Sequence, residues 1–349
     1  MSPRRRLLAV VATAGLLAAS ACGSAPEEPA EQAVASAEAG TVVLYSGRNE
    51  NLIGPVLDKF TAATGIKIAA RDGGSAELAA QLLEEGDRTP ASVFLSQDAG
   101  ALGALQDADR LEQLPSATLE KVPAKYRSGQ GRWVGVSGRS RVLVYNPDLV
   151  PQTELPQSVF DLTGPAYKGK VGYAPTNASF QSFVTGMRVT VGEQRTTSFL
   201  EGFKDNEPKA YESNSLIVAA VNNGEIPFGL TNHYYLYEKA SEAGGLDKLT
   251  ARNHLFPGTD PGSLVNVAGV AVLAGQQSEQ AQAFVDYLLS KSAQTYFAAQ
   301  TKEYPLVAGV DADVPGLPPL SSLSGPQFDL SQLDSLEQTL RLLDEVGLT

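Results

Sequence analysis

The sequence predicts an α/β protein built as two lobes. Its 349 residues are about the length of two domains of roughly 100–200 residues each. It is 43% hydrophobic and 19% charged, the composition of a globular protein that can bury a large core. Short apolar runs alternate with helical patterns along the chain, which is typical of parallel or mixed sheets covered by helices.

The first 21 residues have the pattern of a secretory signal peptide. Three arginines at positions 4–6 precede an apolar run at 7–21, which is shorter than the roughly 20 residues that span a bilayer. The run ends in Ala-Ser-Ala directly before Cys22, and this ending resembles a bacterial lipobox. We therefore expect residues 1–21 to be a lipoprotein signal peptide and Cys22 to carry the lipid.

Residues 22–40 are predicted to form a flexible tether. They are rich in Pro, Ala and Glu and have almost no bulky apolar side chain to bury. The expected arrangement is a domain outside the cytoplasm, lipid-anchored through this stalk to the outer face of the cell membrane. A simply secreted protein with a ragged N-terminus is the alternative.

Charge and residue counts exclude several classes of partner and site. Without the three leader arginines the chain has 24 basic and 39 acidic residues, a net charge of −15, which argues against nucleic acid as a partner. One Cys and two His are too few for a zinc finger, a disulfide framework or a three-histidine site. Any metal is therefore expected to be held by oxygen.

The first elements form a βαβ pattern. A β-rich run at 41–45 and a second one at 66–70 flank a helix whose apolar residues, Ile53, Val56, Leu57 and Phe60, recur at helical spacing. Further strands are expected at 92–95, 142–145, 170–174, 226–230 and 267–273. A last helix, with leucines at 333, 336, 340 and 343, is expected to close one lobe.

No string in the sequence indicates an enzyme. Residues 164–170 copy the glycine and lysine spacing of a P-loop, but Val171 follows where Mg²⁺ needs Ser or Thr, and the string precedes a strand rather than a helix. No nucleophile elbow or zinc-protease motif occurs, and neither His233 nor His254 lies beside an obvious nucleophile in the sequence.

Two adjacent tyrosines, Tyr234 and Tyr235, lie at a polar turn after the strand at 226–230. In one interpretation these rings and Tyr237 open a helix and pack half-buried. In the other, consecutive phenols at a strand-to-helix turn converge on one cation. Phenolate is a hard anionic ligand, and a trivalent cation such as ferric iron supplies enough field to deprotonate a group whose free pKa is about 10.

Together with three further motifs, this tyrosine pair gives the chain a family resemblance. The motifs are LYSGRN at 44–49, GDRTPASVF at 86–94 and GKVGYAPT at 169–176. Over residues 41–349 the chain resembles the ferric-iron-binding proteins of the ABC-transporter solute-binding class. The resemblance implies a two-lobed periplasmic-binding-protein-like fold of type II, whose lobes are joined by crossing hinge strands and close over iron in the cleft.

The resemblance also implies how the chain divides between the lobes. The N-terminal α/β lobe is expected at 41–140, with a return segment at about 265–314. The C-terminal α/β lobe is expected at 141–264, with the C-terminal helix at about 315–349.

The family's tyrosine pair aligns with Tyr234 and Tyr235, so the resemblance implies that these residues bind the metal. Many members add a histidine after the first strand and a glutamate after the strand at 92–95. In this chain those positions hold Asn49 and Gln97, which remain candidate metal ligands. Asp98, next to Gln97, is a candidate substitute for the missing carboxylate.

Two other side chains near these motifs are not expected to bind the metal. A second branch of the family uses a further tyrosine at a position where this chain has Phe180, which cannot act as a ligand. His233 lies beside the tyrosine pair, but the family has an asparagine there. We expect His233 to lie behind the site or at the surface.

Charge arithmetic predicts an anion beside the metal, because two phenolates neutralise two of three positive charges and the amides at 49 and 97 add none. The family uses a synergistic anion such as phosphate or carbonate. The candidate partners of this anion are the backbone N–H groups and hydroxyls at 176–179 and one guanidinium. Two further asparagines align with anion contacts of the family. The full set of candidates is Thr176, Asn177, Ala178, Ser179, Asn214, Asn232 and Arg48. In the alternative interpretation each Asn caps its own backbone, and Arg48 is a solvated surface charge.

The function implied by the resemblance is capture of ferric iron and its delivery to an ABC permease driven by a separate ATPase. The protein is then a monomer that catalyses no reaction. One alternative is a solute receptor for an organic anion such as a phosphonate, which the neutral Asn49 and Gln97 could hydrogen-bond. An alternative of another class is an extracellular hydrolase with a carboxylate pair in its cleft.

Overall fold

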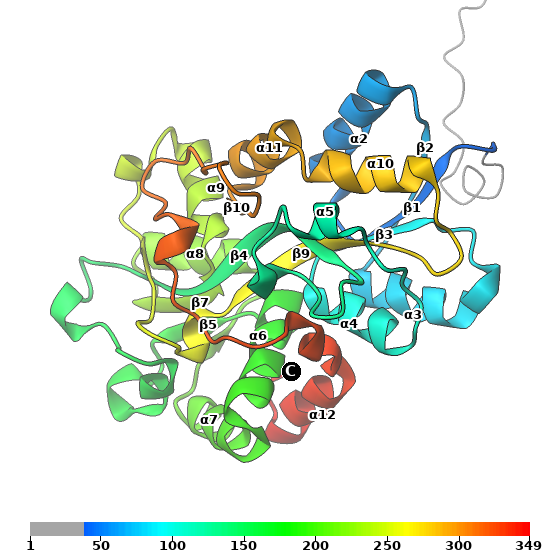
Figure 1. Ribbon diagram of the computed structural model, residues 1–349. Coiled ribbons are helices and arrows are strands. Elements are labelled where there is room, and N and C mark those ends of the chain that lie inside the picture. The colour runs from blue at the N-terminus through cyan, green and yellow to red at the C-terminus, as the bar shows by residue number, and fades with distance from the viewer. Residues whose placement is uncertain (1–37) are drawn as a thin grey trace, which may run out of the picture.

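The computed structural model describes residues 38–349 (Figure 1). The expected signal peptide, Cys22 and the tether as far as residue 37 lie outside the described residues. Within the described part of the chain, no helix is both long enough and apolar enough to cross a membrane.

The described residues contain one mixed ten-stranded sheet. Its order is β2-β1-β3-β9-β4-β7-β5-β6, and β10 and β8 also pair with β4. Neighbours are parallel at both ends of the sheet, whereas β4 and β9 run antiparallel to their neighbours. The strands are β1 (Val42–Ser46), β2 (Ile68–Asp72), β3 (Val93–Ser96), β4 (Val134–Tyr145), β5 (Val171–Tyr173), β6 (Lys209–Ala210), β7 (Phe228–Asn232), β8 (Arg252–His254), β9 (Val265–Val272) and β10 (Tyr304–Pro305).

Strand β4 joins two halves of this sheet. From Val134 to Ser140 it pairs with β9, and from Arg141 to Tyr145 it pairs with β7 and β8. We call β1, β2, β3, β9, β10 and the first part of β4, with their helices, the first half, and β5 to β8 with the rest of β4 the second half. The change of partners falls between Ser140 and Arg141, at the lobe boundary expected from the sequence, and the division into lobes stays a prediction.

Helices cover both faces of the first half: α2, α10 and α11 lie on one side of β1, β3 and β9, and α3 and α4 lie on the other (Figure 1). Helix α2 begins after Asn49, whose side chain accepts a hydrogen bond from the backbone of Asn51, and ends at Gly65 in the left-handed region. The α-helices are α2 (Glu50–Thr64), α3 (Ser75–Glu85), α4 (Ala99–Asp107), α5 (Ser116–Leu119), α6 (Ala178–Val191), α7 (Glu193–Asp205), α8 (Asn214–Asn222), α9 (Tyr234–Ala243), α10 (Glu279–Leu288), α11 (Lys291–Thr301) and α12 (Leu336–Val346).

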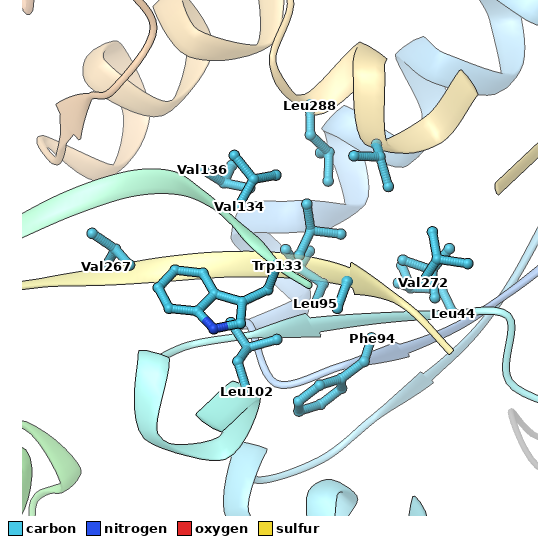
Figure 2. Packing of buried hydrophobic residues seen from close by; sticks show 14 of the residues in the cluster. Leu44, Phe94, Leu95, Leu102, Trp133, Val134, Val136, Val267, Val272 and Leu288 are labelled. Atoms are coloured by element: carbon cyan, nitrogen blue, oxygen red, sulfur yellow. The ribbon is translucent and has the colours of Figure 1, made fainter. Parts of the chain in front are cut away.

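Each half has a hydrophobic core of its own. In the first half, Trp133 lies beside Leu102 and under β9, among apolar side chains of β3, β4 and α10 (Figure 2). The indole N–H of Trp133 donates to Ser331 Oγ at 3.0 Å, so its polar atom is satisfied. The larger core of the second half joins β5 and β7 to α6, α7 and α12.

The C-terminal segment is shared between the halves, which differs from its expected place in one lobe. Leu330 and Leu333, in the 3₁₀ turn η9 (Leu330–Asp334), belong to the first core, whereas Leu343 and Val346 of α12 belong to the second. A leucine stripe predicts that a helix packs against a core, but it does not predict which of the two cores.

Most predicted strands agree with the structure to within about two residues, but β4 starts eight residues earlier than expected. Its first part reads Val-Gly-Val-Ser-Gly-Arg-Ser and lacks the continuous apolar run that predicts a buried strand. All of it is nevertheless buried, because β9 and β10 flank it.

Close packing of α4 against η9 gives a test of this arrangement. A Cβ at Gly103 would overlap the backbone carbonyl of Ser331, whereas a Cβ at Gly54 in α2 meets nothing within 4 Å. We expect Gly103→Ala to lower the free energy of unfolding by about 1–3 kcal/mol. Gly54→Ala, the control, is expected to raise it by up to about 1 kcal/mol, because Ala favours the helix more than Gly does. Urea unfolding measures both, and equal stabilities would contradict the packing described here.

Candidate functional site

A cavity of about 160 Å³ lies where the two halves meet. Side chains that follow strands in both halves line it, as expected for a ligand site in an α/β fold. The lining residues are Gln97, Asp98, Arg139, Arg141, Asn177, Ala178, Ser179, Ser182, Phe183, Asn232, Tyr234, Tyr235, Leu264 and Asn266.

The tyrosine pair forms part of this wall at the start of α9, directly after β7. The ring centroids of Tyr234 and Tyr235 are 4.2 Å apart, and the ring planes are inclined by 30°. The pair therefore opens a helix, as the first interpretation of the sequence expected. It also faces a cavity, as the second interpretation required. Tyr237 points elsewhere, and its hydroxyl donates to the carbonyl of Gly316 at 2.8 Å.

Burial raises the pKa of Tyr234 well above its usual value, and the neighbouring Tyr235 raises it further. Without a cation this phenol is therefore protonated at neutral pH. A cation that binds here has to displace protons, and only a highly charged one supplies the necessary field.

The most unusual group in the wall is Arg141, which the sequence analysis did not single out. It is 2% exposed, and its guanidinium donates to the carbonyl of Leu230 at 2.9 Å and to Ser179 Oγ at 3.2 Å. Burial lowers its pKa to about 9, and the two tyrosines partly offset that effect. Among the described residues no carboxylate pairs with it, and its Nε has no hydrogen-bond partner. The cavity therefore has a buried positive charge in its wall.

A second buried cluster supports the wall from the first half. Glu303 accepts two hydrogen bonds from Arg48, at 2.9 and 3.1 Å, and one from Ser137 Oγ at 2.6 Å, and its carboxylate lies 3.9 Å from Arg139 Nε. Burial alone would raise the pKa of Glu303, but the charges of Arg48 and Arg139 and the hydrogen bonds outweigh it and lower the pKa to about 2. Arg139 also donates to the backbone carbonyl of Gln97, so the cluster is tied to the cavity wall.

The segment before α6 brings several predicted anion contacts together. Asn177 caps the helix: its Oδ1 accepts from the backbone N–H of Ser179 at 3.0 Å and from the Ser179 hydroxyl at 2.6 Å. Asn214 reinforces this turn by donating to Asn177 Oδ1 and to Ser179 Oγ. Asn232 lies next to Arg141, whose guanidinium is 3.4 Å from its Oδ1.

Four of the predicted site residues do not reach the cavity wall. Asn49, a candidate metal ligand, is exposed and caps α2. Arg48 is only 5% exposed and is committed to Glu303 and Gln97, so the idea of a solvated surface charge is wrong. Thr176 lies in an outer groove described below, and Asn214 is fully buried behind Asn177. Gln97, Asn177, Ala178, Ser179, Asn232 and the two tyrosines do line the cavity.

His233 lies behind the site, with both ring nitrogens in use. Its Nδ1 accepts from the backbone N–H of Ser140 at 3.1 Å, so Nε2 carries the proton and donates to the carbonyl of Lys302 at 3.0 Å. The ring stacks on Tyr304 with centroids 4.5 Å apart. Burial lowers the pKa of His233 to about 4, which keeps the imidazole neutral.

Comparison with known proteins identifies the type of molecule to which this cavity belongs. Residues 88–329 match the family described as bacterial extracellular solute-binding protein. The chain belongs to this family. The solute-binding protein is 37% identical over 316 residues to the Fe(3+)-binding periplasmic protein of Serratia marcescens, covering 90% of this chain and 92% of the relative. It is 36% identical over 310 residues to the major ferric iron-binding protein of Neisseria meningitidis serogroup B, covering 88% and 93%.

Solved structures agree with this assignment. Iron-bound HitA from Pseudomonas aeruginosa superposes with a TM-score of 0.80 at 35% identity, covering 88% of this solute-binding protein and 99% of HitA. A Trichodesmium protein in complex with iron and citrate superposes with a TM-score of 0.75 at 30% identity, covering 89% and 100%. The predicted family and the two-lobed α/β fold are confirmed, and members of the family bind solutes outside the cytoplasm rather than transform them.

Two arginines of this site, Arg139 and Arg141, could not be found from the sequence. Both lie in the stretch Ser-Gly-Arg-Ser-Arg, which reads like a solvated turn. Positions 139 and 141 alternate along a strand, so their side chains lie on the same face of the sheet. This signal is visible only once the start of β4 at Val134 is known.

The buried cluster around Glu303 predicts a specific dependence of stability on pH. The pKa of Glu303 is lowered from 4.5 to about 2. The ionised carboxylate therefore contributes fully to the free energy of unfolding above about pH 4.5, and this contribution is lost as the pH falls through 2. The loss amounts to about 3 kcal/mol. At pH 7, Glu303→Gln leaves two buried arginines without their counter-ion and is expected to cost about 3–5 kcal/mol.

Urea unfolding at pH 7 and pH 3 measures both effects of Glu303→Gln. Glu84→Gln, on the exposed face of α3, serves as the matched control and is expected to change stability by less than about 0.5 kcal/mol. A Glu303→Gln protein as stable as Glu84→Gln at pH 7 would contradict the role of the cluster.

Proposed function

We propose that this protein binds ferric iron together with a small anion in the cavity and delivers it to the permease of an ABC importer, which a separate ATPase drives. The observation that carries the proposal is the juxtaposition, in one cavity, of two adjacent phenols and a buried guanidinium that pairs with no carboxylate among the described residues. Relatives of 36–37% identity that are named for ferric iron binding support the same cargo.

The charges in the cavity explain why both a cation and an anion are needed. Two phenolates reduce the charge of ferric iron from three to one, and Arg141 adds another positive charge beside it. Phosphate or carbonate restores the balance and can accept hydrogen bonds from Arg141 and from the backbone N–H of Ala178, the first residue of α6. Ser179 Oγ donates to Asn177 and accepts from Asn214 and from Arg141, so it holds the guanidinium beside this N–H.

Binding at this place can couple the cargo to closure of the two halves. The tyrosines belong to the second half, whereas Gln97 and Asp98 belong to the first, and β4 passes directly behind the cavity. A ligand that contacts both walls stabilises the closed arrangement by its higher affinity for it. The permease then has a surface that differs between loaded and empty protein.

An organic anion such as a phosphonate is the second candidate cargo, and Arg141 is the observation that favours it. The guanidinium could bind the anion without any metal. That alternative gives the tyrosine pair no role, and it predicts a colourless complex. A visible phenolate-to-iron absorption band separates the two.

We also propose that the chain works as a monomer anchored by a lipid on Cys22. The Ala-Ser-Ala ending of the apolar leader directly before Cys22 supports the anchor, and the polar stretch up to residue 40 has the composition of a tether. Membrane fractionation of the native chain and of Cys22→Ser tests the anchor. Release of only the variant into the soluble fraction is expected.

Removing both phenols tests the metal site. The double variant Tyr234→Phe, Tyr235→Phe is expected to lose the visible band and to bind ferric iron at least about 100-fold more weakly, because no anionic oxygen of α9 remains. Tyr237→Phe in the same helix removes a phenol that faces Gly316 and should bind iron normally. Titration with ferric iron, followed by absorbance, measures both. Unchanged iron binding by the double variant would refute these ligands.

Varying the anion tests Arg141. We expect phosphate or carbonate to tighten ferric iron binding by the native protein, and Arg141→Gln to reduce this gain by about tenfold or more, since the charge-assisted hydrogen bonds are lost. Arg195→Gln, at an exposed position of α7, is the control. Iron binding that is equally tight without any anion would contradict the charge argument.

A further inference from the structure

The first half contributes few free oxygen atoms to the cavity, although a bridging cation needs at least one. Gln97 Oε1 accepts a hydrogen bond from Arg48 at 2.9 Å, and its backbone oxygen accepts from Arg139. Asn266 Oδ1 accepts from the backbone N–H groups of Val267 at 2.8 Å and Ala99 at 3.3 Å. Both amide oxygens on this wall are therefore already in use.

Asp98 is the one carboxylate among the residues that line the cavity. Its Oδ1 caps α4 by accepting from the backbone N–H groups of Gly100 at 2.9 Å and Ala101 at 3.2 Å. Its Oδ2 receives no hydrogen bond from any described residue. The cap fixes the orientation of the carboxylate and leaves one anionic oxygen available.

Asp98 also lies at the junction of the cavity with a larger outer groove. This groove, of about 600 Å³, runs between α3, α4, α6 and the segment 333–336, and it shares Gln97, Asp98, Ala178 and Ser182 with the cavity. The carboxylate of Asp98 therefore belongs to the walls of both the groove and the cavity, whereas the two phenols belong to the cavity alone.

We propose that Asp98 Oδ2 is a third anionic ligand of ferric iron and the ligand that ties the cargo to the first half. This inference rests on the proposed function. Two phenolates and one carboxylate then neutralise the three positive charges of the iron, and a singly charged anion, dihydrogen phosphate or hydrogencarbonate, is enough to balance Arg141. Asp98 replaces the carboxylate that Gln97 lacks, shifted by one residue along the same loop.

The test uses the fact that Asn caps helices as well as Asp does. Asp98→Asn keeps the cap of α4 and removes the charge, whereas Asp98→Ala removes both. Glu77→Gln, in the wall of the outer groove, is the matched control for loss of a nearby carboxylate. Each full-length protein is titrated with ferric iron in phosphate, with absorbance and competition by citrate as readouts, and the melting temperature of the unloaded protein is recorded.

We expect Asp98→Asn to melt like the native protein, to bind iron at least about tenfold more weakly and to shift the phenolate-to-iron band to longer wavelength. The shift arises because an iron with one fewer anionic ligand accepts charge from phenolate at lower energy. Asp98→Ala should also melt at a lower temperature, and Glu77→Gln should match the native protein in every readout.

Native affinity and an unshifted band in Asp98→Asn would overturn the inference. This holds even if Asp98→Ala loses iron, because Asp98 would then act only as a helix cap. An equal loss in Glu77→Gln would overturn it too, since the effect would be one of general charge. In either case the proposed function still stands if the double tyrosine variant loses iron, and it fails if that variant keeps it.

Discussion

Strand β4 carries Arg139 and Arg141 into the junction between the two halves, where both are almost fully buried. Arg139 shares the carboxylate of Glu303 with Arg48, whereas Arg141 has no carboxylate partner among the described residues. A buried charge without a partner is costly, so the junction is stable only if the surrounding polar groups or a ligand compensate it. The cavity, its hydrogen bonds and its preference for negative charge all depend on this strand.

The site combines two opposing electrostatic demands. Burial keeps Tyr234 protonated when no cation is present, and it lowers the pKa of Arg141 only to about 9, so that the guanidinium stays charged at neutral pH. A ferric ion with its anion satisfies both, because the cation replaces the phenol protons and the anion pairs with the guanidinium. A cation alone would add to the positive charge of Arg141, and an anion alone would leave the phenols without a role, which gives a physical reason for joint binding. Because the walls come from both halves, the same event favours closure.

The α/β class, most strands and the helix that begins at Tyr234 could be predicted, because apolar runs and turn residues are local signals. Partners that are distant in the sequence could not. Glu303 lies 255 residues from Arg48, and without it the sequence offered Arg48 only as an anion contact or as a solvated charge. Arg141 could not be recognised because its burial comes from neighbouring strands and from α6. Asn49 is the opposite case, because its role is local: it caps the helix that begins at the next residue.

The most direct test is a crystal structure of the protein loaded with ferric iron in phosphate, with the metal located by its anomalous scattering. The account predicts one iron between the Oη atoms of Tyr234 and Tyr235, with the anion against Arg141 and the two halves closed around it. Iron bound elsewhere, or an anion bound at Arg141 while the two phenols contact no metal, would contradict it.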